Sequence, residues 1–171
     1  MINKIKIEIG NIVDYNVDAI VNSANIWLLA GSGVCGAIFK AAGRFELQEE
    51  CNKYNGCETG KAVITNGYNL KSKYIIHAVG PRYTDDNDAV LLESTYKSIL
   101  DLSKEYNIKT LAIPSISTGV YRYPVDKAVK IALNTIISNN VDTIETIYIV
   151  CFDKVTYNSY INEYNNILNN K

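Results

Sequence analysis

The stretch DAIVNSANIWLLAGSGVCGAIFKAAG, residues 18–43, combines a short strand, a polar turn and a helix. Residues 18–21 are a predicted strand, and the tetrapeptide NSAN at 22–25 ends it with two carboxamides. Gly31 and Gly33 can adopt positive φ and let a ligand lie against bare backbone. Apolar residues recur at helical spacing from residue 34, so Ser32 or Gly33 is expected to cap a helix. The free N–H groups of its first turn suit an anion.

The length and composition indicate one globular domain that covers residues 1–171. The chain is 47% hydrophobic and 20% charged, ordinary values for a folded protein. No apolar run approaches the roughly 18 residues of a membrane span. The N-terminal MINKIKIEIG alternates as a strand does and lacks the apolar core of a signal peptide. We therefore expect a cytoplasmic protein, a monomer, with no membrane partner.

Charge and cysteine usage argue against a nucleic-acid partner and against a metal. Seventeen basic and 18 acidic residues give a formal net charge of −1, and no cluster of Lys and Arg could neutralise several phosphates. Cys35, Cys51, Cys57 and Cys151 show no CxxC spacing, and free thiols in a reducing cytoplasm are the simplest interpretation. A zinc site made of three of them with His77, the only histidine, is disfavoured because no pair has ligand spacing. We expect no cofactor.

Alternating strand and helix patterns predict a three-layer α/β/α fold with a mixed, mostly parallel central sheet. The connection between the predicted strands 62–65 and 74–79 has no room for a helix, which favours an antiparallel pair. Residues 147–152 are nearly all apolar, as in a strand in the middle of a covered parallel sheet. His77 lies within the strand 74–79, and a hydrogen-bonded core residue is favoured there over a catalytic base.

Two loops of small residues follow predicted strands. The first is the glycine-bearing loop of residues 30–33, and the second is PSISTGVY at 114–121, which follows the strand 110–113 and precedes a helix that is expected to start at Pro124. A glycine-containing turn often only reverses the chain, so the first loop alone leaves a binding site and a plain turn equally open. Ligands of such sheets bind beyond the carboxyl ends of the strands, and two such loops suit a diphosphate or phosphosugar better than a metal. The P-loop and Rossmann motifs are absent.

At this point the sequence resembles the macrodomain family, and within it the MacroD-type ADP-ribosyl hydrolase branch. The matching stretches cover nearly the whole chain in the family's order: GNIV at 10–13, VDAIVNSAN at 17–25, LLAGSGVCGAIFKAAG at 28–43, GCETGKAVITNGYNL at 56–70, KYIIHAVGP at 73–81 and IPSISTGVYRYP at 113–124. The resemblance implies the macrodomain fold. It also implies ADP-ribose, or a protein carrying ADP-ribose, as the partner.

The resemblance also assigns roles to individual residues. Asn25 matches the family's asparagine on the distal ribose hydroxyls, which a carboxamide can meet as donor and acceptor. Phe152 matches the aromatic position that stacks on adenine, while a core phenylalanine is an equally open interpretation. Asn11 and Ile12 match the segment beside adenine. The two loops match those that hold the distal ribose and the diphosphate, with Gly31, Ser32, Gly33 and Val34 in the first and Ser117, Thr118, Gly119, Val120 and Tyr121 in the second.

Three positions depart from the family pattern. Asn11 stands in place of an aspartate, so its amide oxygen can accept a bond from adenine without the added strength of a charge; this residue can also simply cap its own turn. Arg122 replaces a glycine and either contacts a phosphate or, as we favour, reaches into solvent. Cys35 stands where the hydrolase branch carries the aspartate proposed to activate water.

The sequence therefore leaves two functions open. The leading hypothesis is an enzyme, an ADP-ribosyl hydrolase that removes mono-ADP-ribose from acidic side chains or an O-acetyl-ADP-ribose deacetylase, with Asn25 and Cys35 as the candidate catalytic residues. The alternative is a non-catalytic reader of ADP-ribose, which Cys35 favours. At Cys35 itself, a small, partly buried residue that closes the helix against the loop is favoured over a catalytic thiol.

Overall fold

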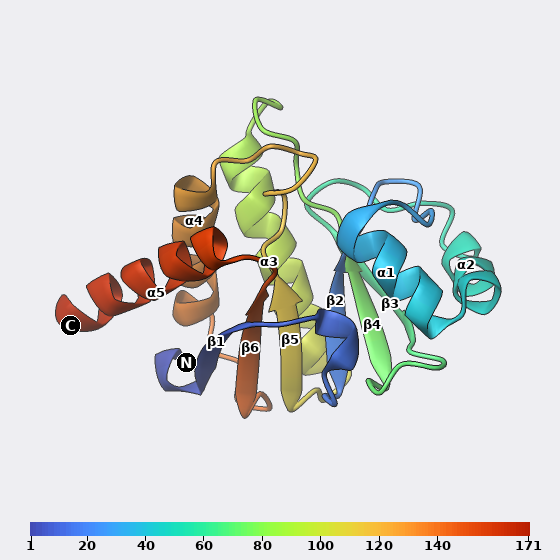
Figure 1. Ribbon diagram of the computed structural model, residues 1–171, viewed down its shortest axis with the longest axis horizontal. Helices are drawn as coiled ribbons and strands as arrows, with labels where there is room; N and C mark the ends of the chain where they lie inside the picture. Colours follow the sequence, from blue (N-terminus) through green and yellow to red (C-terminus); the bar gives the residue numbers. More distant parts are fainter.

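The computed structural model describes residues 1–171, and a six-stranded sheet lies at its centre (Figure 1). The strand order is β1-β6-β5-β2-β4-β3. All neighbours are parallel except β3 and β4, which pair antiparallel. The predicted mixed, mostly parallel sheet is thus confirmed. The strands are β1 (Ile5–Ile9), β2 (Ala19–Ser23), β3 (Ala62–Asn66), β4 (Tyr74–Ala78), β5 (Thr110–Pro114) and β6 (Thr146–Cys151).

Helices cover both faces of the sheet, which confirms the three layers (Figure 1). Successive side chains of a strand point to opposite faces, so Ala19 and Val21 of β2 lie in one core and Ile20 in the other. The larger core packs against α3, α4 and α5, and the smaller one against α1 and α2. The helices are α1 (Gly33–Ala42), α2 (Arg44–Asn52), α3 (Asp88–Glu105), α4 (Val125–Ser138) and α5 (Lys154–Asn169), with short 3-10 turns η1 (Ile2–Lys4) and η2 (Ile12–Asp14).

The apolar strand β6 has the position that its composition predicts. It pairs with β1 on one side and with β5 on the other, in parallel register with both. His77 on β4 is fully buried, pairs in register with Asn22 of β2 and makes side-chain hydrogen bonds, so its interpretation as a core residue is confirmed.

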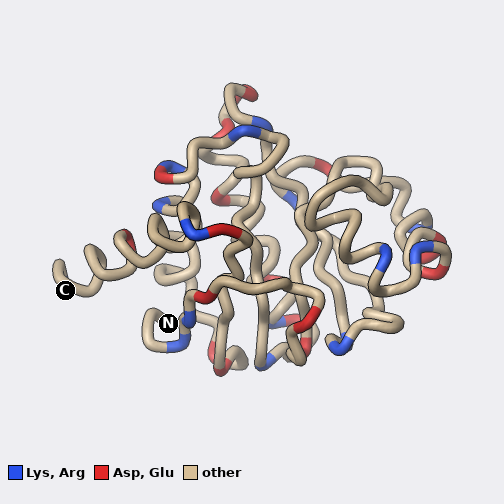
Figure 2. Tube along the Cα trace, viewed as in Figure 1, with Lys and Arg blue, Asp and Glu red and all other residues tan.

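Basic and acidic residues are intermixed along the chain. Figure 2 shows Lys and Arg interspersed with Asp and Glu along the trace. No helix is both long enough and apolar enough to cross a bilayer. The four cysteines form no disulfide. The monomeric state and the lack of a nucleic-acid partner stay predictions.

Candidate ligand-binding cleft

A cleft with two adjoining chambers lies beyond the carboxyl ends of β2, β5 and β6. The Asn25 chamber has a volume of about 430 Å³ and the Phe152 chamber about 480 Å³. The walls that both chambers share are Gly33, Val34, Pro114, Ser115 and Gly119. Every candidate site residue predicted from the sequence lines one chamber or both. The residues that line only the Asn25 chamber are Asn25, Gly31, Ser32, Cys35, Ser117, Val120 and Tyr121. Those that line only the Phe152 chamber are Asn11, Ile12, Thr118 and Phe152, and those that line both are Gly33, Val34 and Gly119.

The shared wall includes the N-terminus of α1, as the helix pattern predicts. Ser32 is the N-cap residue, and its side chain makes no capping hydrogen bond. The first N–H groups of a helix have no partner within the helix and favour negative charge. No Lys or Arg lines either chamber. An anion in this cleft would therefore be held by backbone N–H groups rather than by a cationic side chain.

The two glycines of the first loop serve different purposes. Gly33 has a φ of +59° and open space around it, as expected. Gly31 does not adopt positive φ, which corrects the expectation that both glycines would be able to use it. The Gly31 carbonyl instead packs on α1, where a Cβ built on Gly36 would lie closer than 3.0 Å to the Gly31 oxygen. The loop thus depends on Gly36, a residue outside it, for its close approach to the helix.

The second loop contains a strained and buried serine. Ser117 has a φ of +68°, and its hydroxyl is buried without a hydrogen-bond partner. A Cβ built on Gly80 would collide with the Ser117 oxygen, so the two segments are in close contact. An unpaired buried polar group costs free energy unless a partner arrives. The residue lines the Asn25 chamber, while its hydroxyl oxygen lies against Gly80.

Two further residues of this segment differ in their surroundings. Burial raises the pKa of Tyr121, so the phenol in the Asn25 chamber stays neutral near pH 7. Arg122 is exposed, has a φ of +58° and lines neither chamber. Arg122 thus reaches into solvent, as the sequence analysis favours.

Asn25 holds the loop that follows it. Its Oδ1 accepts the backbone N–H groups of Trp27 at 3.2 Å and Leu29 at 3.1 Å. Its Nδ2 donates to the Leu29 carbonyl at 2.9 Å. The sequence suggests a carboxamide that offers a ligand both a donor and an acceptor, but the oxygen already accepts two bonds from the backbone. One N–H of the Asn25 amide is left to face the chamber.

Cys35 lies at the cleft side of a chain of side-chain hydrogen bonds that runs into the core. Its Sγ donates to the Leu29 carbonyl at 3.6 Å and accepts from Asn22 Nδ2 at 3.7 Å. The same Asn22 amide contacts Nδ1 of His77 at 3.0 Å, and Nε2 of His77 contacts the Thr65 hydroxyl at 2.9 Å. Burial lowers the pKa of His77 to about 3, so the ring is neutral at physiological pH. These contacts support the interpretation of Cys35 as a residue that closes α1 against the loop.

Phe152 projects into the Phe152 chamber from the end of β6. Its side chain is 86% exposed, so a core phenylalanine is excluded. Beside it, Asp153 caps α5 by accepting the Thr156 N–H at 2.7 Å, which lowers the pKa of the carboxyl. On the neighbouring segment, which Gly10 joins to Cys151 by a backbone hydrogen bond, Asn11 caps η2 by accepting the Val13 N–H at 3.3 Å. The capping role considered for Asn11 is therefore confirmed, and the residue lines the chamber as well.

Similarity to known proteins identifies the family. A family model described as "Macro domain" matches residues 21–132. The chain belongs to the macro domain family. This macrodomain is 44% identical to O-acetyl-ADP-ribose deacetylase 1 of Pantoea vagans, over 92% of this chain and 96% of that protein. It is also 44% identical to ADP-ribose glycohydrolase MACROD2 of Xenopus laevis, over 88% of this chain and 37% of that longer protein.

The same fold occurs in solved macrodomain structures. A mutant of the Oceanobacillus iheyensis macrodomain with ADPR has a TM-score of 0.89 and 38% identity to this chain, with 100% of this chain and 97% of that chain covered. The resemblance predicted from the motifs, and the fold that it implies, are thus confirmed.

Three residues that line the macrodomain cleft were not among the candidates predicted from the sequence. Ser115 lines both chambers, Trp27 lines the Asn25 chamber and Asp153 lines the Phe152 chamber. Ser115 and Trp27 carried a usable signal, since Ser115 belongs to the second quoted loop and Trp27 is the only tryptophan of the chain, placed at a strand end. Asp153 directly follows Phe152, which is the predicted adenine-stacking position.

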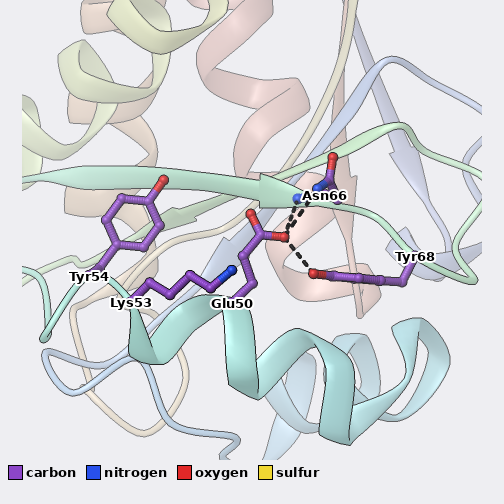
Figure 3. Close-up of a pocket in the computed structure, with 5 residues that line it drawn as sticks. All are labelled: Glu50, Lys53, Tyr54, Asn66 and Tyr68. Atoms are coloured by element: carbon purple, nitrogen blue, oxygen red, sulfur yellow. Dashed lines mark hydrogen bonds between the residues drawn. The ribbon is translucent and has the colours of Figure 1, made fainter.

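A separate hollow of about 330 Å³ lies between α2 and β3 of this macrodomain (Figure 3). There Glu50 Oε1 accepts hydrogen bonds from the Asn66 backbone and amide and from the Tyr68 hydroxyl. Lys53 and Tyr54 complete the wall. None of these residues lines the cleft, and Glu50 uses its bonds to tie α2 to the end of β3.

Proposed function

We propose that this macrodomain binds ADP-ribose across the two chambers and hydrolyses the bond between its distal ribose and an attached acyl group. The substrates would be proteins mono-ADP-ribosylated on acidic side chains, O-acetyl-ADP-ribose, or both. The observation that carries the proposal is the order of groups along the cleft. An exposed aromatic ring stands at one end, a helix N-terminus with glycine backbone in the middle, and a carboxamide at the other end.

That order matches the parts of the ligand. Phe152 would stack on adenine, with Asn11 and Ile12 beside the base, since an exposed ring offers its whole face. The N-terminus of α1, the glycine backbone of the first loop and the second loop would hold the diphosphate. The free N–H of Asn25 would meet a hydroxyl of the distal ribose. The names of the relatives, a deacetylase and a glycohydrolase, agree with this ligand.

The hydrolytic step must do without a protein carboxylate near the reacting bond. No Asp, Glu or His lines the Asn25 chamber. We infer that the bound diphosphate itself orients the attacking water, while Asn25 holds the distal ribose so that the water lies within attack distance. The water adds to the acyl carbon, the bond from that carbon to the ribose oxygen breaks, and the ribose hydroxyl takes up a proton. An anionic diphosphate beside the thiol makes Cys35 a poor base.

The same absence of a carboxylate favours a second candidate, a non-catalytic reader. The Asn25 chamber would then hold ADP-ribose on a protein without cleaving it. Binding alone does not separate the two candidates, whereas turnover does.

The test combines calorimetry with a hydrolysis assay. ADP-ribose is expected to bind more tightly than AMP, because only a ligand with a second ribose reaches Asn25 and the first loop. Equal affinities for ADP-ribose and AMP would remove the basis of the assignment. Release of ADP-ribose from a mono-ADP-ribosylated protein, or of acetate from O-acetyl-ADP-ribose, would establish the enzyme. ADP-ribose binding without either product would establish the reader.

Replacing Cys35 by alanine tests how the hydrolytic step is carried. We expect Cys35→Ala to retain ADP-ribose binding and most of the turnover, since the ligand's phosphates and Asn25 act in the step and the thiol closes α1 against the loop. Cys35→Asp, which restores the residue typical of the branch, should leave turnover unchanged or raise it. Titration calorimetry and initial rates check this. Turnover abolished in Cys35→Ala with the affinity intact would make the thiol catalytic.

A further inference from the structure

Three exposed apolar side chains stand at the edge of the Asn25 chamber. They are Ile26, Trp27 and Leu29, and we call them the apolar rim. Trp27 is 66% exposed and also lines the chamber. Exposed apolar side chains that occur singly need no explanation, but a contiguous group beside a binding cavity marks an interaction site. The proposed catalytic cleft does not use the outward faces of these side chains.

Hydrogen bonds from three parts of the chain fix the backbone of the rim. Asn25 bonds the backbone of Trp27 and Leu29, as described above. Gln48 of α2 accepts the Ala30 N–H and donates to the Leu28 carbonyl, both at 2.9 Å. On the third side, the Cys57 N–H donates to the Ile26 carbonyl at 2.8 Å. These bonds fix the backbone that carries the exposed indole ring.

The buried residue of this segment adds a further constraint. Leu28 is buried, yet it has a φ of +56°, a conformation that a leucine rarely adopts. A strained residue persists only where its surroundings hold it. Since the rim is already ordered, a partner that covers it loses little conformational entropy in binding.

The position of the rim indicates which part of the ligand it would face. Phe152 and the rim stand at opposite ends of the cleft, with the shared wall between them. If adenine lies on Phe152, as the proposed function has it, the rim flanks whatever is attached to the distal ribose. An acetyl group is too small to cover an indole ring, but the side chains of a polypeptide are large enough to cover it.

The chemistry of the rim also limits the partner. No charged residue occurs between Asp18 and Lys40 in the sequence, so the rim itself offers apolar area and backbone groups. Tryptophan is among the residue types most enriched in the side chains that dominate binding energy at interfaces. We propose, resting on the proposed function, that the apolar rim contacts apolar side chains of the polypeptide that carries ADP-ribose, and that it thereby selects modified polypeptides over O-acetyl-ADP-ribose.

The test compares two ligands in three proteins. The ligands are free ADP-ribose and a peptide that carries ADP-ribose through a non-hydrolysable linkage, with leucine on either side of the modified position. The proteins are the wild type, Trp27→Ala and Phe45→Ala. Phe45 is the matched control because it is 77% exposed on the neighbouring helix α2 and lines neither chamber. Calorimetry measures the affinities, and thermal unfolding verifies that the variants fold.

We expect the peptide to bind the wild type about 10-fold or more tightly than free ADP-ribose, since truncation of a central aromatic side chain typically costs that much. Trp27→Ala should remove this gain, so that the ratio of the two affinities falls to about one, and Phe45→Ala should leave both affinities unchanged. Equal affinities of the wild type for both ligands would overturn the proposal, as would an equal loss for both in Trp27→Ala. A wild type that does not bind free ADP-ribose would instead overturn the proposed function.

Discussion

Replacing Gly36 by alanine is expected to lower the ADP-ribose affinity and to destabilise the fold. The new Cβ would lie closer than 3.0 Å to the Gly31 carbonyl oxygen, a backbone atom that cannot rotate away. Alanine gains about 1 kcal/mol over glycine from helix propensity, but overpacking of this kind costs about 1 to 3 kcal/mol, so the clash dominates. The loop must shift away from α1, which displaces part of the wall that faces the ligand.

Gly119→Ala is the matched control for the effect of Gly36→Ala on stability. Gly119 also belongs to the cleft wall, but a Cβ there meets no atom within 4 Å and the residue has no positive φ. Thermal unfolding should therefore leave Gly119→Ala at the wild-type midpoint and lower that of Gly36→Ala. A Gly36→Ala protein that binds ADP-ribose with wild-type affinity would show that the packing of Gly31 on α1 is unimportant for the site.

The second large effect is a loss of folding stability at low pH. Burial lowers the pKa of His77 to about 3 in the folded protein, whereas an exposed histidine in the unfolded chain has a pKa of about 6.5. Between these two values the unfolded state binds one more proton than the folded state, so stability falls as the pH falls. The contribution is about 1.4 kcal/mol per pH unit, or about 3 kcal/mol between roughly pH 6.5 and pH 4.5. Above about pH 6.5 His77 contributes no pH dependence.

Urea unfolding at several pH values measures this slope. His77→Gln lacks the titrating ring, so its free energy of unfolding should fall by about 1.4 kcal/mol less per pH unit over the same range, whatever its absolute stability. NMR provides an independent reading in the wild type, because His77 is the only histidine and its ring signals need no assignment. A midpoint near the ordinary value of about 6.5 in the folded protein would contradict the buried, neutral ring.

The periodicity of the chain predicts most of the fold. The alternation of β1 and the apolar run of β6 predict strands, and the short connection between β3 and β4 predicts their antiparallel pairing, because strand faces and connection lengths are local properties. The same reasoning brings the two small-residue loops to one edge of the sheet, since parallel strands end there together. The exposure of Phe152 could not be predicted, because an aromatic residue at a strand end is compatible with a core or a cleft.

The residue types of the cleft and their order along the chain were already present in the sequence, and so was the departure at Cys35. What these residues do with their polar atoms depends on close contacts between segments that periodicity does not relate. Folding commits the Asn25 oxygen to the loop backbone, leaves the Ser117 hydroxyl unpaired against Gly80 and makes Gly36 the support of Gly31. Hydrogen-bond partners and steric clearances are set by the packed backbone, and only the tertiary structure determines them.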